Sequence, residues 1–540
     1  MSATRFEPST STEFVNYLTG YFRSSARTRS ILLYGPLGAF VAGAMISVVD
    51  LTIGVAAIAL LVVVIMTWLH PPFAGYAMVS AAPAIVGLER YQVIPVLRPN
   101  EALLFVLIGV LSIRWMVYSR KIEIRLNRMD FAMIALVLAG FALPLLTQFA
   151  RLRPVSPDDI LYALVFVRLG LLYGLVRYTI RTRGQVRAAI GFSLATASVL
   201  GIVGLADSLN ILNTAERLNP YFPNAGPIAD DGRGAASIGN PIGFGVYVGI
   251  NACLALAMLL GGERPRPMLA IAAICCTIGV FGSGQIGPSI SFAVGLVALA
   301  ILTRSVTQLV KWAVPMVLVA SIVIAPLVVE RINGFSGYAV TSADRQSIAD
   351  TGGQEESRAL FAANPGSSWD VRLYNLETFF IPRFNEPANV YFGVTPQARV
   401  PSPNEGEDFI WIESGHLWLV WSGGLPLFFA FFGFIAVGMY VGYQGTRRVP
   451  GPVGIVGAAL FAALAMLFVA QTFDPHLTLR GTSDILYPLA ALGVCGGLRG
   501  KRHERSELTE SVDRSGPTSS VENVRCEAVG AHRPVRGNYE

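Results

Sequence analysis

Long apolar runs separated by short polar connections fill most of the chain between residues 31 and 498. The hydrocarbon core of a bilayer is about 30 Å thick, and a helix needs roughly 17–25 apolar residues to cross it. In hydrocarbon, each backbone N–H and C=O must be bonded within its own segment, which favours helices for such runs. The runs predict about 12–14 transmembrane helices, at 31–49, 51–69, 71–88, 101–119, 131–149, 159–178, 188–206, 236–260, 268–283, 286–303, 309–328, 416–442, 453–472 and 482–498.

The composition agrees with a membrane-embedded chain. Hydrophobic residues make up 53% of the 540 and charged residues 14%, whereas an ordinary soluble domain carries about 25% charged residues. The net charge of +6 could suggest a nucleic-acid partner, but the Arg and Lys residues lie in short clusters between apolar runs and not along one soluble face. We therefore expect an all-α integral membrane protein that binds no nucleic acid.

The basic clusters occur on alternate connections, which predicts the sidedness of the chain. They include RWMVYSRKIEIRLNR, RYTIRTRGQVR, ERPRP and QGTRRVPGP, and the connections between them are acidic or mixed. The positive-inside rule then places both termini in the cytoplasm. We expect a cytoplasmic N-terminal segment (1–30), a transmembrane bundle (31–328), a large extracytoplasmic loop with short helices (329–415), C-terminal transmembrane helices (416–498) and a disordered cytoplasmic tail (499–540).

The large loop contains a predicted helix in NPGSSWDVRLYNLETFFIPRF. Ser367 or Ser368 can cap its N-terminus, and apolar residues follow at helical spacing. Arg372 lies in the first turn, where the helix dipole does not favour a cation. Two interpretations stay open: Arg372 binds an anion, or it pairs with Asp370 or Glu377.

Two further arginines are candidates for binding an anion. Arg233 precedes a glycine-rich approach to Asn240-Pro241, and such a helix start can bind phosphate through its backbone N–H groups. The alternative is an ordinary turn that opens a membrane helix. Arg168 lies inside ALVFVRLGLLYGLV, where a cation costs about 3 kcal/mol or more unless it faces a partner or a cavity. We expect it to line the interior, either paired structurally or touching a polar headgroup.

His416 stands where the acidic segment EDFIWIESG meets a long apolar run. It could be an interfacial residue in an aromatic belt with Trp411, Trp418 and Trp421. It could instead be a general base oriented by Glu413, because imidazole titrates near neutral pH. The histidines show neither HxH nor HExxH spacing, so we predict no metal site.

The order of these features resembles the O-antigen ligase and polymerase family of bacterial envelope glycosyltransferases. The resemblance rests on R-x-x-x-x-x-G-N-P before one span, GSGQIGPS before another, WDVRLYNLETFF and VYFGVTP in the loop, and ESGHLWLVWSGGLPLFF after it, over roughly residues 130–495. It implies a metal-independent, cofactor-free transferase of the GT-C kind in the bacterial inner membrane. Its donor would be a glycan linked to undecaprenyl pyrophosphate, and its acceptor a glycan or a lipid.

The resemblance also implies roles for particular residues. Arg233 and Arg372 match arginines that hold the donor's pyrophosphate, and His416 matches the histidine that activates the acceptor hydroxyl. The family turn usually reads Ser-Arg-Gly, whereas Gln285 stands in this neighbourhood here. That departure removes one expected phosphate-binding charge and raises the question whether Arg168 or Arg480 replaces it.

Three classes of function stay open from the sequence. The first is a polymerase for exopolysaccharide, capsule or O-antigen, slightly favoured over a ligase to a lipid or protein acceptor because the chain is longer than a compact ligase needs. The second is a non-enzymatic polysaccharide transporter or flippase, which predicts ion pairs at mid-bilayer depth. The third is a membrane scaffold whose loop binds a partner.

Overall fold

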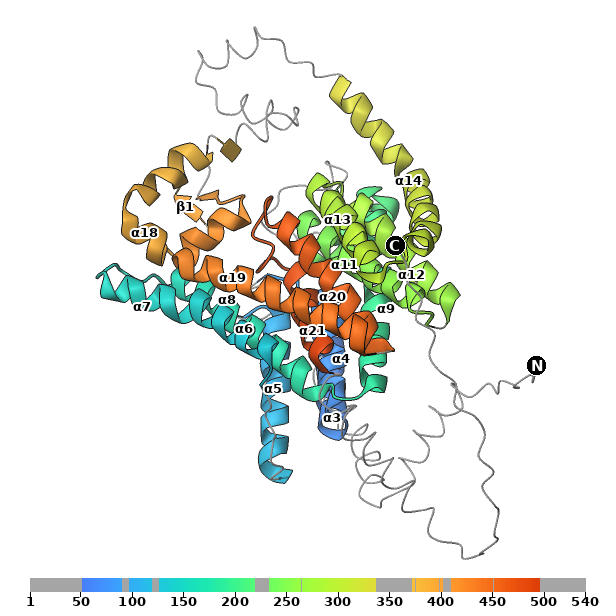
Figure 1. The fold of residues 1–540 in the computed structure, drawn as a ribbon, viewed down its shortest axis with the longest axis horizontal. Helices are drawn as coiled ribbons and strands as arrows, with labels where there is room; N and C mark the ends of the chain where they lie inside the picture. The colour runs from blue at the N-terminus through green and yellow to red at the C-terminus, as the bar shows by residue number, and fades with distance from the viewer. Residues whose placement is uncertain are drawn as a thin grey trace, which may run out of the picture. The chain divides into compact units, whose positions relative to one another are not determined.

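The computed structural model describes residues 51–89, 97–118, 126–218, 233–263, 265–336, 372–373, 375–397, 399–401, 409–449 and 451–495. Nearly all of these residues are helical, and the helices are labelled in Figure 1. The predicted N-terminal segment (1–30), the first predicted span (31–49) and the predicted tail (499–540) lie outside the described residues, as does the helix start predicted at Ser367 or Ser368.

Every predicted span other than 31–49 coincides with helical residues. The helices are α3 (Leu51–Leu69), α4 (Pro72–Ile85), α5 (Pro99–Tyr118), α6 (Arg128–Val137), which continues through the π-helix η1 (Leu138–Ala142) into α7 (Leu143–Ala150), α8 (Pro157–Thr179), α9 (Arg183–Ser208), α11 (Pro241–Leu260), α12 (Arg266–Gly282), α13 (Ile286–Thr303), α14 (Val306–Ser336), α19 (Gly415–Arg448), α20 (Pro452–Ala470) and α21 (Thr482–Cys495). Nine helices in the described part are long and apolar enough to cross a membrane. The prediction of an all-α, multi-pass membrane protein is confirmed.

Several helices begin where the sequence offers a capping residue. The Ser156 side chain accepts from the backbone N–H of Asp159, and the Asp159 carboxylate accepts from the backbone N–H of Ser156, which starts α8. Thr182 and Gln185 form the same reciprocal arrangement at the start of α9. Such pairs satisfy backbone donors that have no partner within the helix. The polar residues between the apolar runs therefore fix where the helices begin.

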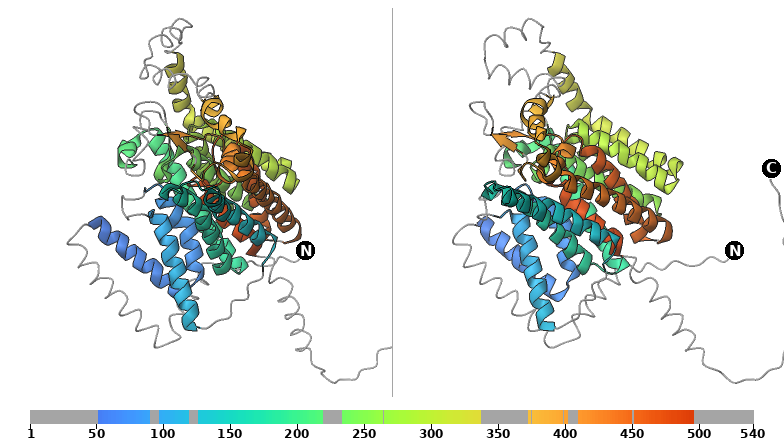
Figure 2. Two further views of the ribbon diagram at one scale, coloured as in Figure 1. Left: turned by 90° about the vertical axis from the view of Figure 1, so that its left-hand side faces the viewer. Right: turned by 60° about the vertical axis from the view of Figure 1, so that its left-hand side comes forward.

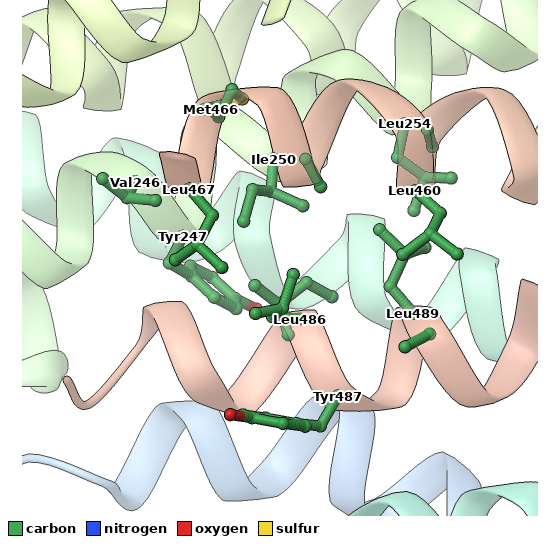
Figure 3. Packing of buried hydrophobic residues seen from close by; sticks show 14 of the residues in the cluster. Val246, Tyr247, Ile250, Leu254, Leu460, Met466, Leu467, Leu486, Tyr487 and Leu489 are labelled. Atoms are coloured by element: carbon green, nitrogen blue, oxygen red, sulfur yellow. The ribbon is translucent and has the colours of Figure 1, made fainter. Parts of the chain in front are cut away.

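The helices α11 and α20 form the centre of the bundle. They pack against each other, and α11 also contacts α9, α12, α13 and α21. Figure 3 shows Ile250 and Leu254 of α11 packed with Leu460 and Leu467 of α20 and with side chains of α21 such as Leu486. These side chains are fully or almost fully buried. The spans that are apolar on all faces of the helix, such as α11 and α20, thus form the interior of the protein.

The segment between α14 and α19 is anchored on a kink in α19. Its described part contains η6 (Leu376–Phe380), η7 (Ile381–Asn385), α18 (Pro387–Phe392) and a short antiparallel pair, β1 (Arg399–Pro401) and β2 (Phe409–Trp411). Gly424 has φ +66°, which breaks the α-helical path of α19 close to the backbone of Tyr391 and Phe392. The buried Trp421 meets Phe380 and Phe384 edge-on and donates from Nε1 to the Gln397 carbonyl at 2.8 Å.

The connections that were predicted to lie outside come together at one end of the bundle, here called the loop face. It comprises 86–89, 151–156, 233–240, 283–285, the described residues of 372–414, and 471–481. The Gly87 amide donates to Ser237 at 3.1 Å, and the Gln397 side chain donates to Ser156 at 2.8 Å. Figure 2 shows the gold-to-orange segment that contains α18 and the strands beside one end of the helices. The connections that alternate with the basic clusters along the sequence are therefore neighbours in the structure.

Candidate functional site

The connection between α20 and α21, residues 471–481, links most of the loop face. The Phe473 carbonyl accepts a hydrogen bond from Arg372 Nη1 at 3.3 Å, and Arg480 Nη1 donates to the Gly87 carbonyl at 3.1 Å. The N-terminus of α19 lies against the same connection: a Cβ added to Gly415 would come within 2.5 Å of the Asp474 carbonyl oxygen. Segments that are far apart in the sequence meet on this short stretch.

Arg372, Glu413 and Asp474 form a charged group on this connection, here called the Asp474 cluster. Arg372 Nε lies 2.5 Å from Glu413 Oε2. Asp474 is influenced by both: burial raises the pKa of its carboxyl to about 7, while Arg372 lowers it and Glu413 raises it further. Burial also raises the pKa of Glu413, against the effect of Arg372. Two carboxyl groups share one guanidinium here, so full ionisation of both is unfavourable.

Polar side chains beneath the cluster hold the connection in shape. Gln471 is fully buried, and its Oε1 accepts from the Leu477 amide at 3.0 Å. The amide of His476 donates to the Asp474 carbonyl at 2.7 Å, and His476 Nδ1 lies 3.1 Å from Thr482 Oγ1. Within the described part of the chain, Asp474 Oδ2 and Gln471 Nε2 are buried without a hydrogen-bond partner. Fourteen side-chain atoms of the described residues are in this state, so it does not by itself mark a ligand site; these two lie in or beneath the charged group.

His416 lies one turn beyond Glu413 but does not pair with it. Its Nε2 lies 3.2 Å from the Phe468 carbonyl near the end of α20, and its ring packs against Phe431, Phe432 and Phe468. A carbonyl can only accept, so Nε2 carries the proton and Nδ1 is the basic atom of the neutral ring. Histidine at a helix C-terminus can satisfy a carbonyl that has lost its helical partner. The contacts of the His416 side chain described here are therefore with α19 and α20 and not with Glu413.

Arg168 lies in the interior and pairs with a carboxylate, which is the first of the two alternatives predicted for it. Its Nη1 is 3.8 Å from Glu101 Oε1, and its Nη2 donates to Ser483 Oγ at 3.5 Å. Glu101 also accepts from the Arg98 amide at 3.1 Å, and Arg98 lies 3.4 Å from Glu89. Together with a hydrogen-bonded pair between Glu89 and Arg480, these residues form a connected group of charged side chains, in which the link from Arg98 to Glu101 is made by the Arg98 backbone amide. The group is here called the Arg480 network: Glu89, Arg98, Glu101, Arg168 and Arg480.

The charges of the Arg480 network, which runs from the loop face into the interior, stabilise one another. Burial alone raises the pKa of Glu89, but Arg480 and Arg98 together bring it below its usual value. Asp484 contributes a further negative charge near Arg480 and accepts from the Gly481 amide at 3.0 Å. Arg480 is thus held by Glu89 and the Gly87 carbonyl. Neither Arg480 nor Arg168 is grouped with Arg372.

Arg233 lies elsewhere on the loop face, at the ends of α9 and α12. Its side chain is exposed. The next residue, Gly234, donates to the Gly282 carbonyl at 3.0 Å, and Asp207 accepts from the amides of Ala235 and Ala236 at 2.8 and 3.2 Å. The Asn240 side chain caps α11 by accepting from Gly243. The polar groups of this glycine-rich approach therefore serve mainly to fold the segment.

Gln285 precedes α13 beside the same region. The backbone N–H of Gln285 donates to Ser283 Oγ at 3.4 Å, and the Ser289 hydroxyl donates to the backbone carbonyl of Gln285 at 3.1 Å. Gly287, two residues on, packs against Phe473. The turn therefore borders the α20–α21 connection, and it contributes an amide side chain where the family pattern has a guanidinium.

The sequence did not single out Asp474 or Gln471. Their importance depends on Arg372 and Glu413, which approach from another part of the chain. A usable signal was present: FDPHLTLRGTSD is a short connection between two strongly apolar spans, and a carboxyl there has little room to avoid burial. Among the described residues, no three His, Cys, Asp or Glu side chains gather in a way that could hold a metal ion.

Comparison with known proteins does not assign a family. No protein-family model matches the chain. No curated protein matches it either.

Proposed function

We propose that this protein is a glycosyltransferase that transfers or polymerises an oligosaccharide linked to undecaprenyl pyrophosphate. Its role would be in exopolysaccharide, capsule or O-antigen assembly at the outer face of the bacterial inner membrane. The observation that carries this proposal is the Asp474 cluster, in which a guanidinium and two carboxyl groups meet at one end of an apolar helical bundle. The resemblance of the sequence motifs to the O-antigen ligase and polymerase family supports the same class.

The chemistry of the reaction suits these groups. Displacing pyrophosphate from an anomeric carbon develops negative charge on the leaving group, and guanidinium groups stabilise such charge through paired hydrogen bonds. Arg372 would take this role, with Arg233 as a second candidate on the same face. A base must also accept the proton of the acceptor hydroxyl, and the sequence predicts His416 with Glu413. The lipid tail of the donor would remain beside the apolar helices.

The distribution of charge supports an outward loop face. Exposed arginines gather at the opposite end of the bundle, and the carboxylates there, among the residues that the structure describes, are Asp130 and Glu263. The Arg187 side chain pairs with Glu263 at 2.8 Å. Basic residues accumulate on the cytoplasmic side of membrane proteins. We therefore propose that this basic end faces the cytoplasm; the exposed arginines include Arg181, Arg183, Arg266, Arg304, Arg447 and Arg448.

One observation favours a transporter as the second candidate. Arg168 lies near the middle of α8 and pairs with the buried Glu101 inside the bundle. Ionisable residues buried within a membrane bundle often line the path of an ion or substrate. A transporter without transferase chemistry would need the Arg168–Glu101 pair, but it would not need Arg372.

A gel of surface glycan and lipid-linked intermediates tests the proposal in a strain that lacks the protein. A polymerase predicts single lipid-linked repeats, a ligase predicts long lipid-linked chains, and an unchanged pattern removes both. The strain is then complemented with the wild type, with Arg372→Ala and with Arg153→Ala. Arg153 pairs with the exposed Glu386 on the same face and serves as the matched control. The transferase predicts that Arg153→Ala restores the glycan and that Arg372→Ala does not.

A further inference from the structure

The Asp474 cluster contains one more carboxyl group than its cation can neutralise. Arg372 Nε is bonded to Glu413 at 2.5 Å, and Arg372 Nη1 is bonded to the Phe473 carbonyl. Asp474 Oδ2 is buried and has no hydrogen-bond partner in the described part of the chain. A buried carboxyl oxygen without a partner costs free energy in the folded protein. A ligand hydroxyl at this position would satisfy it.

Resting on the proposed function, we propose that the Asp474 carboxylate is the group that accepts the proton of the acceptor hydroxyl. The acceptor oxygen forms the new bond to the anomeric carbon of the donor sugar. The bond from that carbon to the pyrophosphate oxygen breaks, and its electron pair leaves with undecaprenyl pyrophosphate. The hydroxyl proton passes to Asp474 Oδ2 and then to water, which restores the carboxylate.

The two other candidate bases in this region are already bonded. The Glu413 carboxylate holds the guanidinium of Arg372, so protonating it would weaken the contact that places Arg372 in the cluster. His416 uses Nε2 to hold the Phe468 carbonyl, and aromatic rings surround its imidazole. Asp474 Oδ2 has no such bond in the described structure. Its carbonyl oxygen is fixed by the His476 amide, so the residue is held in place through its backbone.

The charges that face Asp474 come from several segments and explain why it can exchange a proton near neutral pH. Arg372 approaches from the loop and Glu413 from the short segment between β2 and α19. On its own connection, His476 is buried and Arg480 is bonded to Glu89. Burial raises the pKa of Asp474 to about 7, with Arg372 and Glu413 acting in opposite directions. A base with a pKa near the working pH is effective in proton transfer.

The test uses membrane vesicles that contain the full-length protein and lipid-linked glycan extracted from the strain that lacks it. The rate of glycan transfer is measured between about pH 5 and about pH 9. The wild-type rate should rise with pH to a plateau above about 7, because only ionised Asp474 accepts a proton. Asp474→Asn should lower the plateau rate by about 10²–10⁴-fold, the usual contribution of a general base. Asp158→Asn, at an exposed carboxylate that pairs with the partly buried Arg399, should leave the rate and its pH profile unchanged.

Two further variants keep the test decisive. Asp474→Glu retains a carboxylate and should transfer glycan faster than Asp474→Asn, with a rate that still rises with pH. His416→Asn keeps a donor for the Phe468 carbonyl, and its remaining activity should follow the wild-type pH profile. A flat wild-type profile, or Asp474→Asn with wild-type rates, overturns the role of Asp474 while transferase activity stands. Vesicles in which the wild type forms no product overturn the proposed function itself.

Discussion

The loop face carries two charged groups that are built on opposite principles. In the Arg480 network the charges alternate: Arg98, Arg168 and Arg480 are offset by Glu89 and Glu101, with Asp484 nearby. In the Asp474 cluster one guanidinium serves two carboxyl groups. The first arrangement joins α5 and α8 to the segment that precedes α5 and to the connection between α20 and α21. Both groups contain buried polar atoms without a hydrogen-bond partner among the described residues: Asp474 Oδ2 in the cluster, and Arg98 Nε and Arg168 Nε and Nη1 in the network, where Glu101 still lies 3.8 Å from Arg168 Nη1.

From this difference in charge balance we infer that the Arg480 network stabilises the fold, and we propose that the Asp474 cluster takes part in chemistry. Structural ion-pair networks and catalytic sites both contain buried charge, so burial alone does not separate them. Charge balance does separate them here, because a balanced network gains little by binding another ion. An unbalanced cluster changes its protonation state readily and can exchange a proton with a substrate. The predictions below test this distinction.

The largest effect is expected from breaking the Arg480 network. Arg168→Met should lower the free energy of unfolding by about 3–5 kcal/mol, because it leaves Glu101 buried without its partner. Replacing both residues, as Arg168→Met with Glu101→Gln, should recover much of that loss. Thermal unfolding in detergent measures both effects. If the single variant is as stable as the wild type, the network is not a structural unit, and the transporter alternative gains support.

Arg372 is expected to show the opposite behaviour. Arg372→Ala should reduce glycan transfer by about 10²–10³-fold, equivalent to about 2.7–4 kcal/mol of transition-state stabilisation. Because Arg372 and Glu413 are partly exposed, at 22% and 44% of their side-chain surface, the folded protein should lose much less stability. Transfer assays and melting temperatures are compared with those of Arg153→Ala. A variant that loses stability but keeps its activity would place Arg372 among the structural arginines.

The pH dependence of stability should separate Asp474 from its neighbour His476. Asp474, with its pKa raised to about 7, binds more protons in the folded state than in the unfolded state, so stability falls as pH rises from about 4 to about 7. His476, with its pKa lowered by burial to about 3, has the reverse effect: stability rises with pH from about 3 to about 6.5.

A comparison of variants isolates the Asp474 contribution. The stability of Asp474→Asn relative to the wild type should increase by on the order of 2 kcal/mol between about pH 4 and about pH 7, because the contribution of His476 cancels in the difference. Melting temperatures across this range measure the change. The control is Asp158→Asn, whose difference in stability from the wild type should stay constant with pH. A constant difference for Asp474→Asn as well would show that Asp474 ionises as it does in the unfolded chain.

The sequence predicted the helices well because the thickness of hydrocarbon sets their length. It also predicted that Arg168 must find a partner or a cavity, since a lone cation in the bundle is costly. It did not identify Glu101 as that partner, because the pairing depends on how α5 and α8 pack. Asp474 was missed for a similar reason. Its raised pKa arises from burial, which the short connection between two apolar spans indicates, and from Glu413, about sixty residues earlier, whose approach is not visible along the chain.

The smallest effect on stability is expected at His416, and it separates the two roles considered for this residue: a structural contact and a general base. The Thr472 amide donates to Val469 at 3.0 Å, and the Phe468 carbonyl is bonded to His416 Nε2 at 3.2 Å. Removing this bond by His416→Ala should lower the free energy of unfolding by about 1 kcal/mol, the usual worth of one hydrogen bond. His416→Asn or His416→Gln should recover part of that loss, since each offers an N–H donor. Transfer activity should follow the same order if His416 only holds α19 against α20. If His416→Gln is as stable as the wild type but transfers no glycan, the imidazole itself takes part in the reaction, and Asp474 would not be the sole proton acceptor.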